Sequence, residues 1–257
     1  KHLNLALDVL SDMVKNPKFE ENEMNKERKV ILEEIKMRKD TPQIYVYDKM
    51  SSLLLRGEAG LNLIGDEKTL MSINRDKIVS KFREIYNSSN LFLCVVGDAN
   101  FKKLCTFCEK NFKKSSSKIV EPIIEPYNKK ISESRTGIDQ ASLVFAYHLP
   151  LQNNKLNYAA QVLNCIMGGG MSSRLFQEIR EKRNLVYTVR GSVHLGKRFC
   201  YSSIYAGTSP DNIVLIERLI LEEFTKFVKT GNEKELAQAK EQMLGNNKIS
   251  KEDSQSQ

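Results

Sequence analysis

One segment without regular periodicity, residues 115–135, divides this chain of 257 residues into two parts. It contains three consecutive serines and the prolines Pro122 and Pro126, and its apolar residues follow no helical period. A structureless loop of this length is uncommon inside a compact domain. We therefore expect a linker at 115–135 between an N-terminal domain at 1–114 and a C-terminal domain at 136–257.

Each part combines amphipathic helices with apolar strands. In the first part, the wholly apolar run 91–96 ends at a Gly-Asp turn, which predicts a buried strand. In the second part, strands are expected at 141–149 and, as an alternating pair, at 185–193 and 199–206. This layout favours the α+β class, with a sheet packed by helices in each part. Helices are expected at about 1–14, 20–39, 44–55, 74–86, 101–112, 156–167, 173–183, 210–228 and 233–246.

The charge pattern argues against two classes of partner. Forty Lys and Arg residues against 32 Asp and Glu give a net charge of +8, but the lysines are scattered over predicted helix surfaces without an arginine stripe. We therefore expect no nucleic-acid partner, and a solvated basic surface or a basic cavity for peptides fits better. No apolar run reaches the ~20 residues of a membrane helix, so no membrane partner is expected either.

The cysteines and the start of the chain bear on its compartment. Five cysteines in no framework spacing favour a reducing compartment, such as the cytoplasm or the mitochondrial matrix. Cys105 and Cys108 form a lone C-x-x-C, for which partly buried helix cysteines are favoured over zinc or redox chemistry. The chain lacks a starting Met and begins inside an apparent helix, so we expect a fragment whose targeting signals could lie outside it.

Two glutamates stand seven residues apart on the predicted helix at 20–39. Seven residues turn about 700°, so Glu27 and Glu34 share one face and lie about 10 Å apart along the axis. A carboxylate in apolar surroundings has to be paired, protonated or bound to a metal. Spacing alone favours a salt-bridged helix, in which Glu34 pairs with Arg38, over a metal site. The same face carries three apolar residues: Met24, Ile31 and Ile35.

The second part contains a triple glycine and a pair of hydrogen-bond donors. Gly168, Gly169 and Gly170 are not followed by the Lys of a phosphate loop, so we expect them to allow a close backbone approach or to flex. Arg180 lies near a predicted helix end, and Tyr187 lies in the following strand. Both side chains could bind a peptide carbonyl or an oxyanion. A surface arginine and an ordinary strand tyrosine are equally compatible with the spacing.

Three segments together resemble the M16 peptidases, the group of insulinase, pitrilysin and mitochondrial processing peptidase. They are Glu-Arg-Lys-Val-Ile-Leu-Glu-Glu at 27–34, the stretch from Ile-Gly to Gly-Asp at 64–98, and Gly-Gly-Gly-Met-Ser-Ser-Arg-Leu-Phe-Gln-Glu-Ile-Arg-Glu-Lys-Arg-Asn-Leu-Val-Tyr at 168–187. The resemblance covers nearly the whole chain, and the third segment is the most specific. It implies two M16-like domains of the LuxS/metallohydrolase-like fold, both truncated, with a substrate held between them.

The resemblance also implies roles for single residues. Such enzymes bind zinc through the two histidines of an H-x-x-E-H helix and a glutamate on a later helix, and Glu34 occupies the position of that glutamate. Glu27 corresponds to a supporting acid, and Arg180 and Tyr187 correspond to a substrate-binding pair. The glycines at 168–170 correspond to a flexible loop. In the family, the Glu of H-x-x-E-H is the general base that activates a zinc-bound water.

This sequence departs from the family pattern because it contains no H-x-x-E-H. Its histidines, His2, His148 and His194, form no metal-binding spacing, and a lone His in a strand is more often structural. The resemblance therefore implies a fragment of a longer zinc endopeptidase that acts on unfolded or short polypeptides. We expect no zinc-dependent hydrolysis from this polypeptide alone.

A second interpretation is a non-catalytic M16-like subunit, either a processing-peptidase partner or a core protein of a respiratory complex. A subunit without catalysis does not require Glu27, Glu34, Arg180 and Tyr187 together, so their joint presence favours the catalytic parent. A basic binding module without catalytic ancestry is a weaker third interpretation. The expected partners are a peptide substrate and a second M16-like chain, in a homodimer or a heterodimer.

Overall fold

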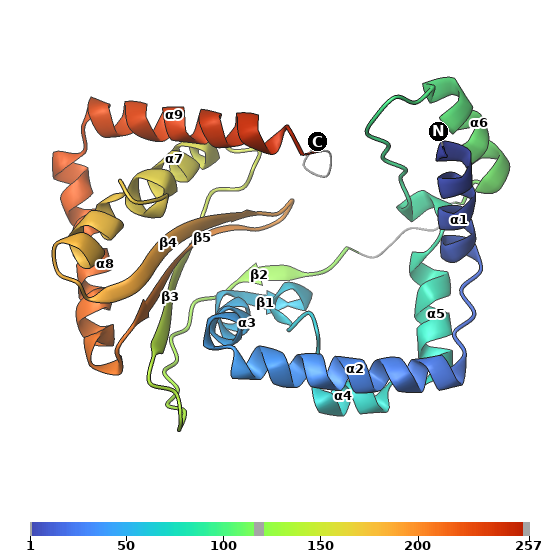
Figure 1. The fold of residues 1–257 in the computed structure, drawn as a ribbon, viewed down its shortest axis with the longest axis horizontal. Helices are drawn as coiled ribbons and strands as arrows, with labels where there is room; N and C mark the ends of the chain where they lie inside the picture. The colour runs from blue at the N-terminus through green and yellow to red at the C-terminus, as the bar shows by residue number, and fades with distance from the viewer. Residues whose placement is uncertain (1, 116–120, 254–257) are drawn as a thin grey trace. The chain divides into compact units, whose positions relative to one another are not determined.

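The computed structural model describes residues 2–115 and 121–253 (Figure 1). The central part of the expected linker, 116–120, lies outside the described residues. The chain forms two compact units: unit 1 comprises Lys1–Ile35, Ile64–Glu121 and Ser250–Gln257, and unit 2 comprises Lys36–Leu63 and Pro122–Ile249. Residues 36–63, which we assigned to the N-terminal domain, thus belong to the second unit. The domain boundaries of the sequence analysis stay a prediction.

Unit 2 is built on a three-stranded antiparallel sheet with the order β3-β5-β4 (Figure 1). The strands are β3 (Ala141–His148), β4 (Val186–Leu195) and β5 (Cys200–Thr208), which confirms the three strands expected in this part of the chain. The central strand β5 pairs with both neighbours, so that Ile204 lies opposite Phe145 of β3. Alternation along β5 turns Ile204 toward one face of the sheet and Tyr205 toward the other.

Helices cover one face of this sheet and form the main core. They are α7 (Leu156–Gly168), α8 (Ile213–Thr230) and α9 (Glu233–Ser250), with a π-helical turn at Phe176–Glu181 and a short 3-10 turn at Pro210–Asn212. Because their apolar faces meet inward-pointing strand residues, side chains from four elements are excluded from water together. The fully buried apolar side chains of this core, among the described residues, are Met167, Leu175, Ile179, Ile204, Ala206, Ile216 and Ile220.

The other face of the sheet packs against α3 (Pro42–Leu54). Met50 and Leu54 of this helix contact Val144 and Ala146 of β3 in a second, smaller core. The chain then continues into β1 (Leu55–Gly57), a 3-10 turn at Glu58–Gly60, and an antiparallel pairing of β1 with β2 (Ile124–Pro126). Unit 2 is therefore a sheet with helices on both faces, and the predicted α+β class is confirmed.

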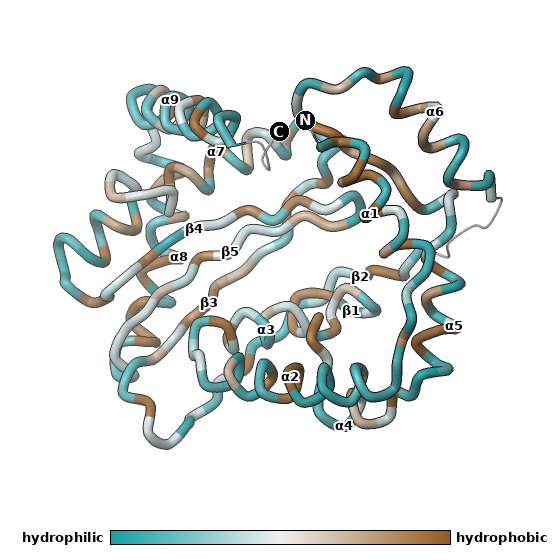
Figure 2. The backbone as a smooth tube through the Cα atoms, turned by 45° about the vertical axis from the view of Figure 1, so that its right-hand side comes forward, coloured by the Kyte–Doolittle hydropathy of each residue, from teal (hydrophilic) through white to brown (hydrophobic). Residues whose placement is uncertain are grey.

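Unit 1 consists of helices and connecting segments. Its helices are α1 (Leu3–Lys15), most of α2 (Glu21–Asp40), α4 (Glu67–Ser72), α5 (Arg75–Ile85) and α6 (Phe101–Asn111), with a 3-10 turn at Ser88–Asn90. Local capping explains several starts: the side chains of Asp66, Asn74 and Asn100 accept hydrogen bonds from backbone N–H groups of the first turn. In Figure 2, α2 is mostly hydrophilic, with separate hydrophobic positions.

The predicted strand at 91–96 is wrong. These residues form no ladder, and no strand lies among the described residues of unit 1. Phe92 is 94% exposed, and Leu91, Leu93 and Val96 are exposed as well. The apolar sequence favours a strand, but a strand needs a neighbouring backbone to satisfy its N–H and C=O groups. Unit 1 supplies none within its described residues.

No helix among the described residues is long and apolar enough to cross a membrane. All five cysteines lie within the described residues and carry free thiols.

Candidate functional site

The two glutamates singled out by their spacing lie on α2, in unit 1. The helix runs without interruption from Glu21 to Asp40, so Glu27 and Glu34 share one face about 10 Å apart along the axis. Both side chains are exposed to solvent. Neither forms an ion pair or a hydrogen bond with any described residue. Two carboxylates are therefore presented on one face of α2 without an ion-pair partner among the described residues.

The salt bridge expected between Glu34 and Arg38 is not formed. Arg38 instead binds Asp48 of α3, with Nη2 2.6 Å from Oδ1 and Nε 3.1 Å from Oδ2. This two-point pairing is stronger than an exposed i,i+4 contact because both donors of the guanidinium fork meet both carboxylate oxygens. The apolar arc around the pair is also weaker than expected, since Ile35 alone among its members is buried.

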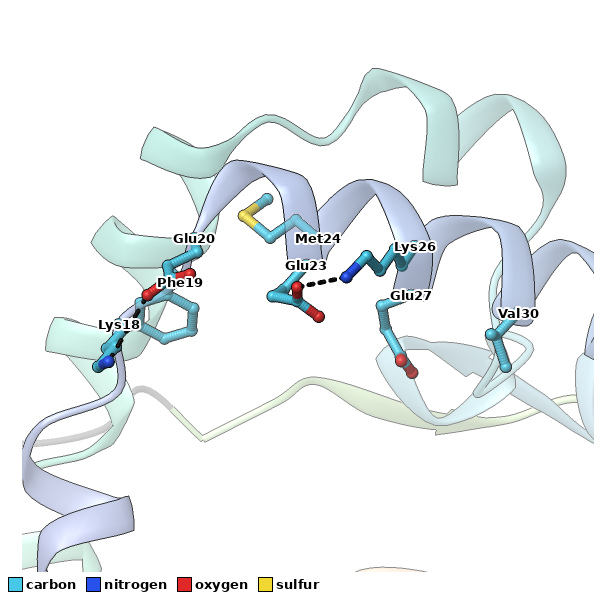
Figure 3. Close-up of a pocket in the computed structure, with 8 residues that line it drawn as sticks. All are labelled: Lys18, Phe19, Glu20, Glu23, Met24, Lys26, Glu27 and Val30. Carbon is cyan, nitrogen blue, oxygen red and sulfur yellow. Dashed lines mark hydrogen bonds and ion pairs between the residues drawn. The ribbon is translucent and has the colours of Figure 1, made fainter.

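Glu27 lines a shallow hollow of about 470 Å³ on the N-terminal half of α2 (Figure 3). Within this hollow, Lys26, the lysine of α2 among the lining residues, pairs with Glu23 at 2.6 Å and is therefore already engaged. Figure 3 shows the Glu27 carboxylate pointing away from that pair, next to Val30. The hollow leaves the oxygens of Glu27 free to accept hydrogen bonds.

The donor set of this chain does not by itself fit a zinc ion. A zinc site in a protein takes at least three ligands from His, Cys, Asp or Glu. Residues 2–115 and 121–253 contain no group of three such side chains placed to hold a metal. Glu34 could contribute one oxygen ligand, and the described residues bring no histidine or cysteine to complete the set.

The triple glycine lies in unit 2, at the end of α7. A Cβ on Gly168 would stand 2.6 Å from the backbone nitrogen of Gly191 in β4, closer than real Cβ atoms approach. Glycine is therefore required here because the helix end and the strand touch through their backbones. Gly170 has a φ of +148°, and the Gly169 carbonyl accepts a hydrogen bond from Gln242 of α9. A flexible loop at these residues stays a prediction.

Arg180 lies on the π-helical turn Phe176–Glu181, which replaces the regular helix expected there. The backbone N–H of Lys182 bonds to the Gln177 carbonyl five residues earlier, which shows the one-residue insertion. The side chain of Arg180 is exposed and lies over the Phe176 ring, 4.8 Å from its centroid. Insertions of this kind are frequent at functional sites because they turn a side chain out of the regular helical position.

Tyr187 lies at a β-bulge near the start of β4. Val186 pairs with Thr208 and Thr188 pairs with Gly207, so Tyr187 is the extra residue and has no partner on β5. Its side chain is 67% exposed. A bulge re-aims the side chain it carries, which presents the phenol to solvent. Arg180 and Tyr187 are thus both exposed donors of unit 2, each held by an irregularity of the backbone.

The sequence analysis missed an ion cluster that fixes the turn carrying Arg180. The buried Glu178 binds Lys182, with Oε2 2.9 Å from Nζ, and also binds Arg183. Lys182 and then Arg183 lower the pKa of Glu178 to about 2. Nearby, Arg174 binds Glu235 of α9 through two hydrogen bonds of 2.6 and 2.8 Å. The spacing Glu178–Lys182 was a readable i,i+4 signal, whereas Arg174–Glu235 joins distant parts of the sequence.

The predicted residues therefore fall into two groups. Glu27 and Glu34 lie together on one helix of unit 1, and Arg180, Tyr187 and the glycines lie within unit 2. The first group is positioned by the helix α2, and the second by the end of α7, the π-helical turn and the β-bulge.

Comparison with known proteins gives consistent matches over nearly the whole chain. The family model described as "Insulinase (Peptidase family M16)" matches residues 1–67, and the model described as "Peptidase M16 inactive domain" matches residues 72–243. A protein of Rickettsia felis named "uncharacterized zinc protease" is 34% identical over 246 residues, which cover 94% of this chain and 59% of that protein. The "uncharacterized zinc protease YmxG" of Bacillus subtilis is 32% identical and is covered over 63% of its length.

Solved structures support the same fold. A chain of complex III2 from Candida albicans, in a structure with Inz-5 bound, superimposes with a TM-score of 0.83 at 16% identity, over 97% of this chain and 61% of that chain. This chain thus spans about three fifths of the length of the relatives it matches.

Proposed function

Because this chain belongs to the M16 family of peptidases, we propose that it is part of a longer zinc-dependent peptidase. In this proposal, the full-length protein hydrolyses peptide bonds in unfolded or short polypeptides. The observation that carries it is the 34% identity, across 94% of the chain, to a protein named as a zinc protease.

Within that enzyme, Glu34 serves as one zinc ligand and Glu27 as the acid that supports it. The unpaired, exposed position of both carboxylates on one face of α2 supports these roles, since a ligand that is not engaged elsewhere is free to bind a metal. The remaining ligands come from parts of the full-length protein outside this chain. The 257-residue polypeptide alone is therefore expected to be inactive.

Arg180 and Tyr187 hold the peptide substrate. Their guanidinium and phenol groups donate hydrogen bonds, and both are exposed and free of ion pairs within the described residues. The backbone beneath them is fixed by the π-helical turn and the bulge, so the donors are placed before a peptide carbonyl arrives. Gly168, Gly169 and Gly170, which precede this turn, serve as a flexible loop beside the fixed donors.

A non-catalytic subunit is the second candidate, and two observations favour it. Residues 72–243 match a family model described as an inactive domain, and a complex III chain shares the fold. In that case the full-length protein pairs with another M16-like chain and contributes binding or structure without chemistry.

The test is the peptidase rate of the purified full-length protein on an unstructured peptide. Glu34→Gln is expected to lower kcat/KM by more than about 100-fold, because changing even a group that supports a metal ligand costs about 10–100-fold. The matched control is Glu33→Gln, which removes the preceding carboxylate, turned about 100° away around the same helix, and should leave the rate unchanged.

The substrate role is tested separately. Arg180→Gln and Tyr187→Phe are each expected to lower kcat/KM by about 10²-fold, the cost of removing one donor at a reacting carbonyl. Equal rates in wild type and all three variants, or no rate above background in the wild type, would reject the peptidase and favour the non-catalytic subunit.

A further inference from the structure

A second polar pocket lies in unit 2, on the face of the sheet that packs against α3. It has a volume of about 390 Å³ and is lined by residues of α3, β4 and β5. Neither Arg180 nor Tyr187 lines it, so the substrate role proposed above does not account for it. The side chains that matter most are Tyr47, Asp48, Arg190, Ser192, His194 and Tyr201. We call it the α3–β4 pocket.

The geometry of the sheet aligns three of these side chains. Arg190, Ser192 and His194 are alternate residues of β4 and therefore point to the same face. His194 lies opposite Tyr201 of β5, and the two rings stack at 4.5 Å with an interplanar angle of 15°. The stacking fixes the imidazole, so one wall of the α3–β4 pocket is set before any ligand binds.

The charges in the α3–β4 pocket do not balance. Asp48 is the one acidic residue among those that line it, and both of its oxygens bind Arg38. Arg190 forms no ion pair or hydrogen bond within the described part of the chain, and its side chain is exposed. A guanidinium with five free donors therefore faces a pocket whose carboxylate is already neutralised.

A buried hydroxyl beside the pocket lacks a partner. Ser203 of β5 is fully buried, and its Oγ has no hydrogen-bond partner among the described residues. It lies directly opposite Ser192 in the register, so the two side chains share the face that meets α3. Native proteins seldom leave a buried hydroxyl unsatisfied, so Ser203 adds one polar group that still needs a partner to the sheet face that carries Ser192.

We propose that the α3–β4 pocket binds a carboxylate through the Arg190 guanidinium, with the Ser192 hydroxyl and the His194 ring as further contacts. The planar fork of arginine matches the two oxygens of a carboxylate. A doubly charged phosphate fits less well, because Arg190 is the one Lys or Arg among the described residues that line the pocket, and the second negative charge would have no cation to pair with. Burial lowers the pKa of His194, which keeps the imidazole neutral and able to donate one N–H to a singly charged group.

The carboxylate belongs either to the C-terminus of a peptide or to a small free acid. Both have the same binding group, and the volume of the pocket admits the group with a few attached carbons. This site is independent of the peptidase proposal, because none of its residues is assigned a role there.

The chain offers a direct spectroscopic probe, since it contains three histidines. We would titrate the purified 257-residue chain with acetate, trialanine, trialanine amide and inorganic phosphate, and follow the imidazole C2 protons by NMR. Substitution of each histidine by Gln assigns the signals. Trialanine is expected to shift the His194 signal saturably while the signals of His2 and His148 stay in place, and the amide is expected to shift none.

Two variants and the choice of probe sharpen the result. Arg190→Gln should weaken binding by about tenfold or more, the effect expected for loss of a charged hydrogen-bonding partner. Arg218→Gln removes the same charge from an exposed position of α8 and should leave binding unchanged. Acetate binding as tightly as trialanine identifies a small free acid as sufficient, and tighter binding of trialanine identifies a peptide C-terminus.

Three outcomes would overturn the carboxylate site. They are the absence of a saturable His194 shift at about 10 mM of either acid, an equal effect of the amide, and tighter binding of phosphate than of both carboxylates. The His148 signal, whose ring contacts the Tyr127 carbonyl at 3.0 Å, reports in each variant that unit 2 stays folded.

Discussion

Unit 2 has a closed core, whereas unit 1 has almost none. Every fully buried side chain of the described residues lies in unit 2, from Asn157 to Ile220 along the chain. In unit 1, the buried apolar side chains among the described residues are Leu7 and Ile35. The difference follows from the sheet: strands give helices a continuous apolar surface to cover, and unit 1 contains no strand within its described part.

The contrast extends to the functional residues. The donors Arg180 and Tyr187 stand on a backbone anchored in a full core, whereas Glu27 and Glu34 stand on a helix that buries little. Unit 1 also leaves an apolar hollow of about 530 Å³, lined by residues of α1, α6 and the segment 91–96. The positions of Arg180 and Tyr187 in unit 2 are therefore fixed by packing, whereas the positions of Glu27 and Glu34 in unit 1 are fixed by local helix geometry. The following predictions test that difference.

The largest effect is expected in the core of unit 2. Ile204→Ala should lower the free energy of unfolding by about 2–5 kcal/mol, because it removes a fully buried side chain from the central strand. Ile249→Ala, on the exposed side of α9, should change it by less than about 0.5 kcal/mol. Urea unfolding followed by circular dichroism measures both. If the two substitutions lower the free energy of unfolding equally, the description of unit 2 as a closed core is contradicted.

A smaller effect is expected where α7 meets β4. Gly168→Ala should cost about 1–3 kcal/mol, because the added methyl group would meet the backbone of Gly191. Gly245→Ala is the matched control, since this glycine lies inside α9 with open space around it and alanine is the better helix former. That substitution should stabilise by about 0.5–1 kcal/mol. If both variants change the free energy of unfolding in the same direction, the close approach of Gly168 to the backbone of Gly191 is contradicted.

The helical part of unit 2 was predictable from local signals, while its irregular turn was not. Apolar periodicity located α7 and α8, and alternation located β3 and the β4–β5 pair. The π-helical turn at Phe176–Glu181 depends on how Glu178 and Arg174 bind their partners, and no period in the sequence encodes that. This turn directs the side chain of Arg180 to solvent, and the bulge does the same for the side chain of Tyr187.

The sequence misled in two places, one in unit 1 and one just past its boundary on α2, and both depend on partners outside the segment itself. The run 91–96 has the composition of a buried strand, but pairing requires a second backbone. Arg38 has Glu34 four residues before it, but Asp48 of α3 offers a better two-point contact. The position of Glu27 and Glu34 on one face was predictable because it follows from helix geometry alone.

The ion cluster of unit 2 should make stability depend on acid pH. The pKa of Glu178 is about 2 in the folded chain and lies near 4.5 without its partners, so its contribution is present above pH 4.5 and is lost as the pH falls toward 2. Glu178→Gln should cost about 1 kcal/mol at pH 7, a modest value because Lys182 and Arg183 are largely solvated. The cost should vanish at pH 2.

Thermal unfolding between pH 2 and 7 measures this dependence. If the wild type and Glu178→Gln lose stability in parallel across that range, Glu178 does not contribute as stated. Asp211→Asn, at an exposed position before α8, serves as a control for the removal of a carboxylate.

The smallest effect is expected in unit 1. Phe92→Ala should change the free energy of unfolding by less than about 0.5 kcal/mol, because the ring is 94% exposed in this chain. The amides of residues 91–96 should exchange with solvent much faster than those of β5, since they form no ladder. Exchange of 91–96 as slow as that of Ile204 would contradict the description of unit 1.

The zinc content of the purified protein tests the central proposal most directly. We expect the full-length protein to retain zinc in stoichiometric amount after dialysis, Glu34→Gln to lose it, and Glu33→Gln to keep it. The 257-residue chain should retain none, because its described residues provide no group of three ligands. Stoichiometric zinc in the 257-residue chain, or unchanged zinc in the full-length Glu34→Gln variant, would contradict the role assigned to Glu34.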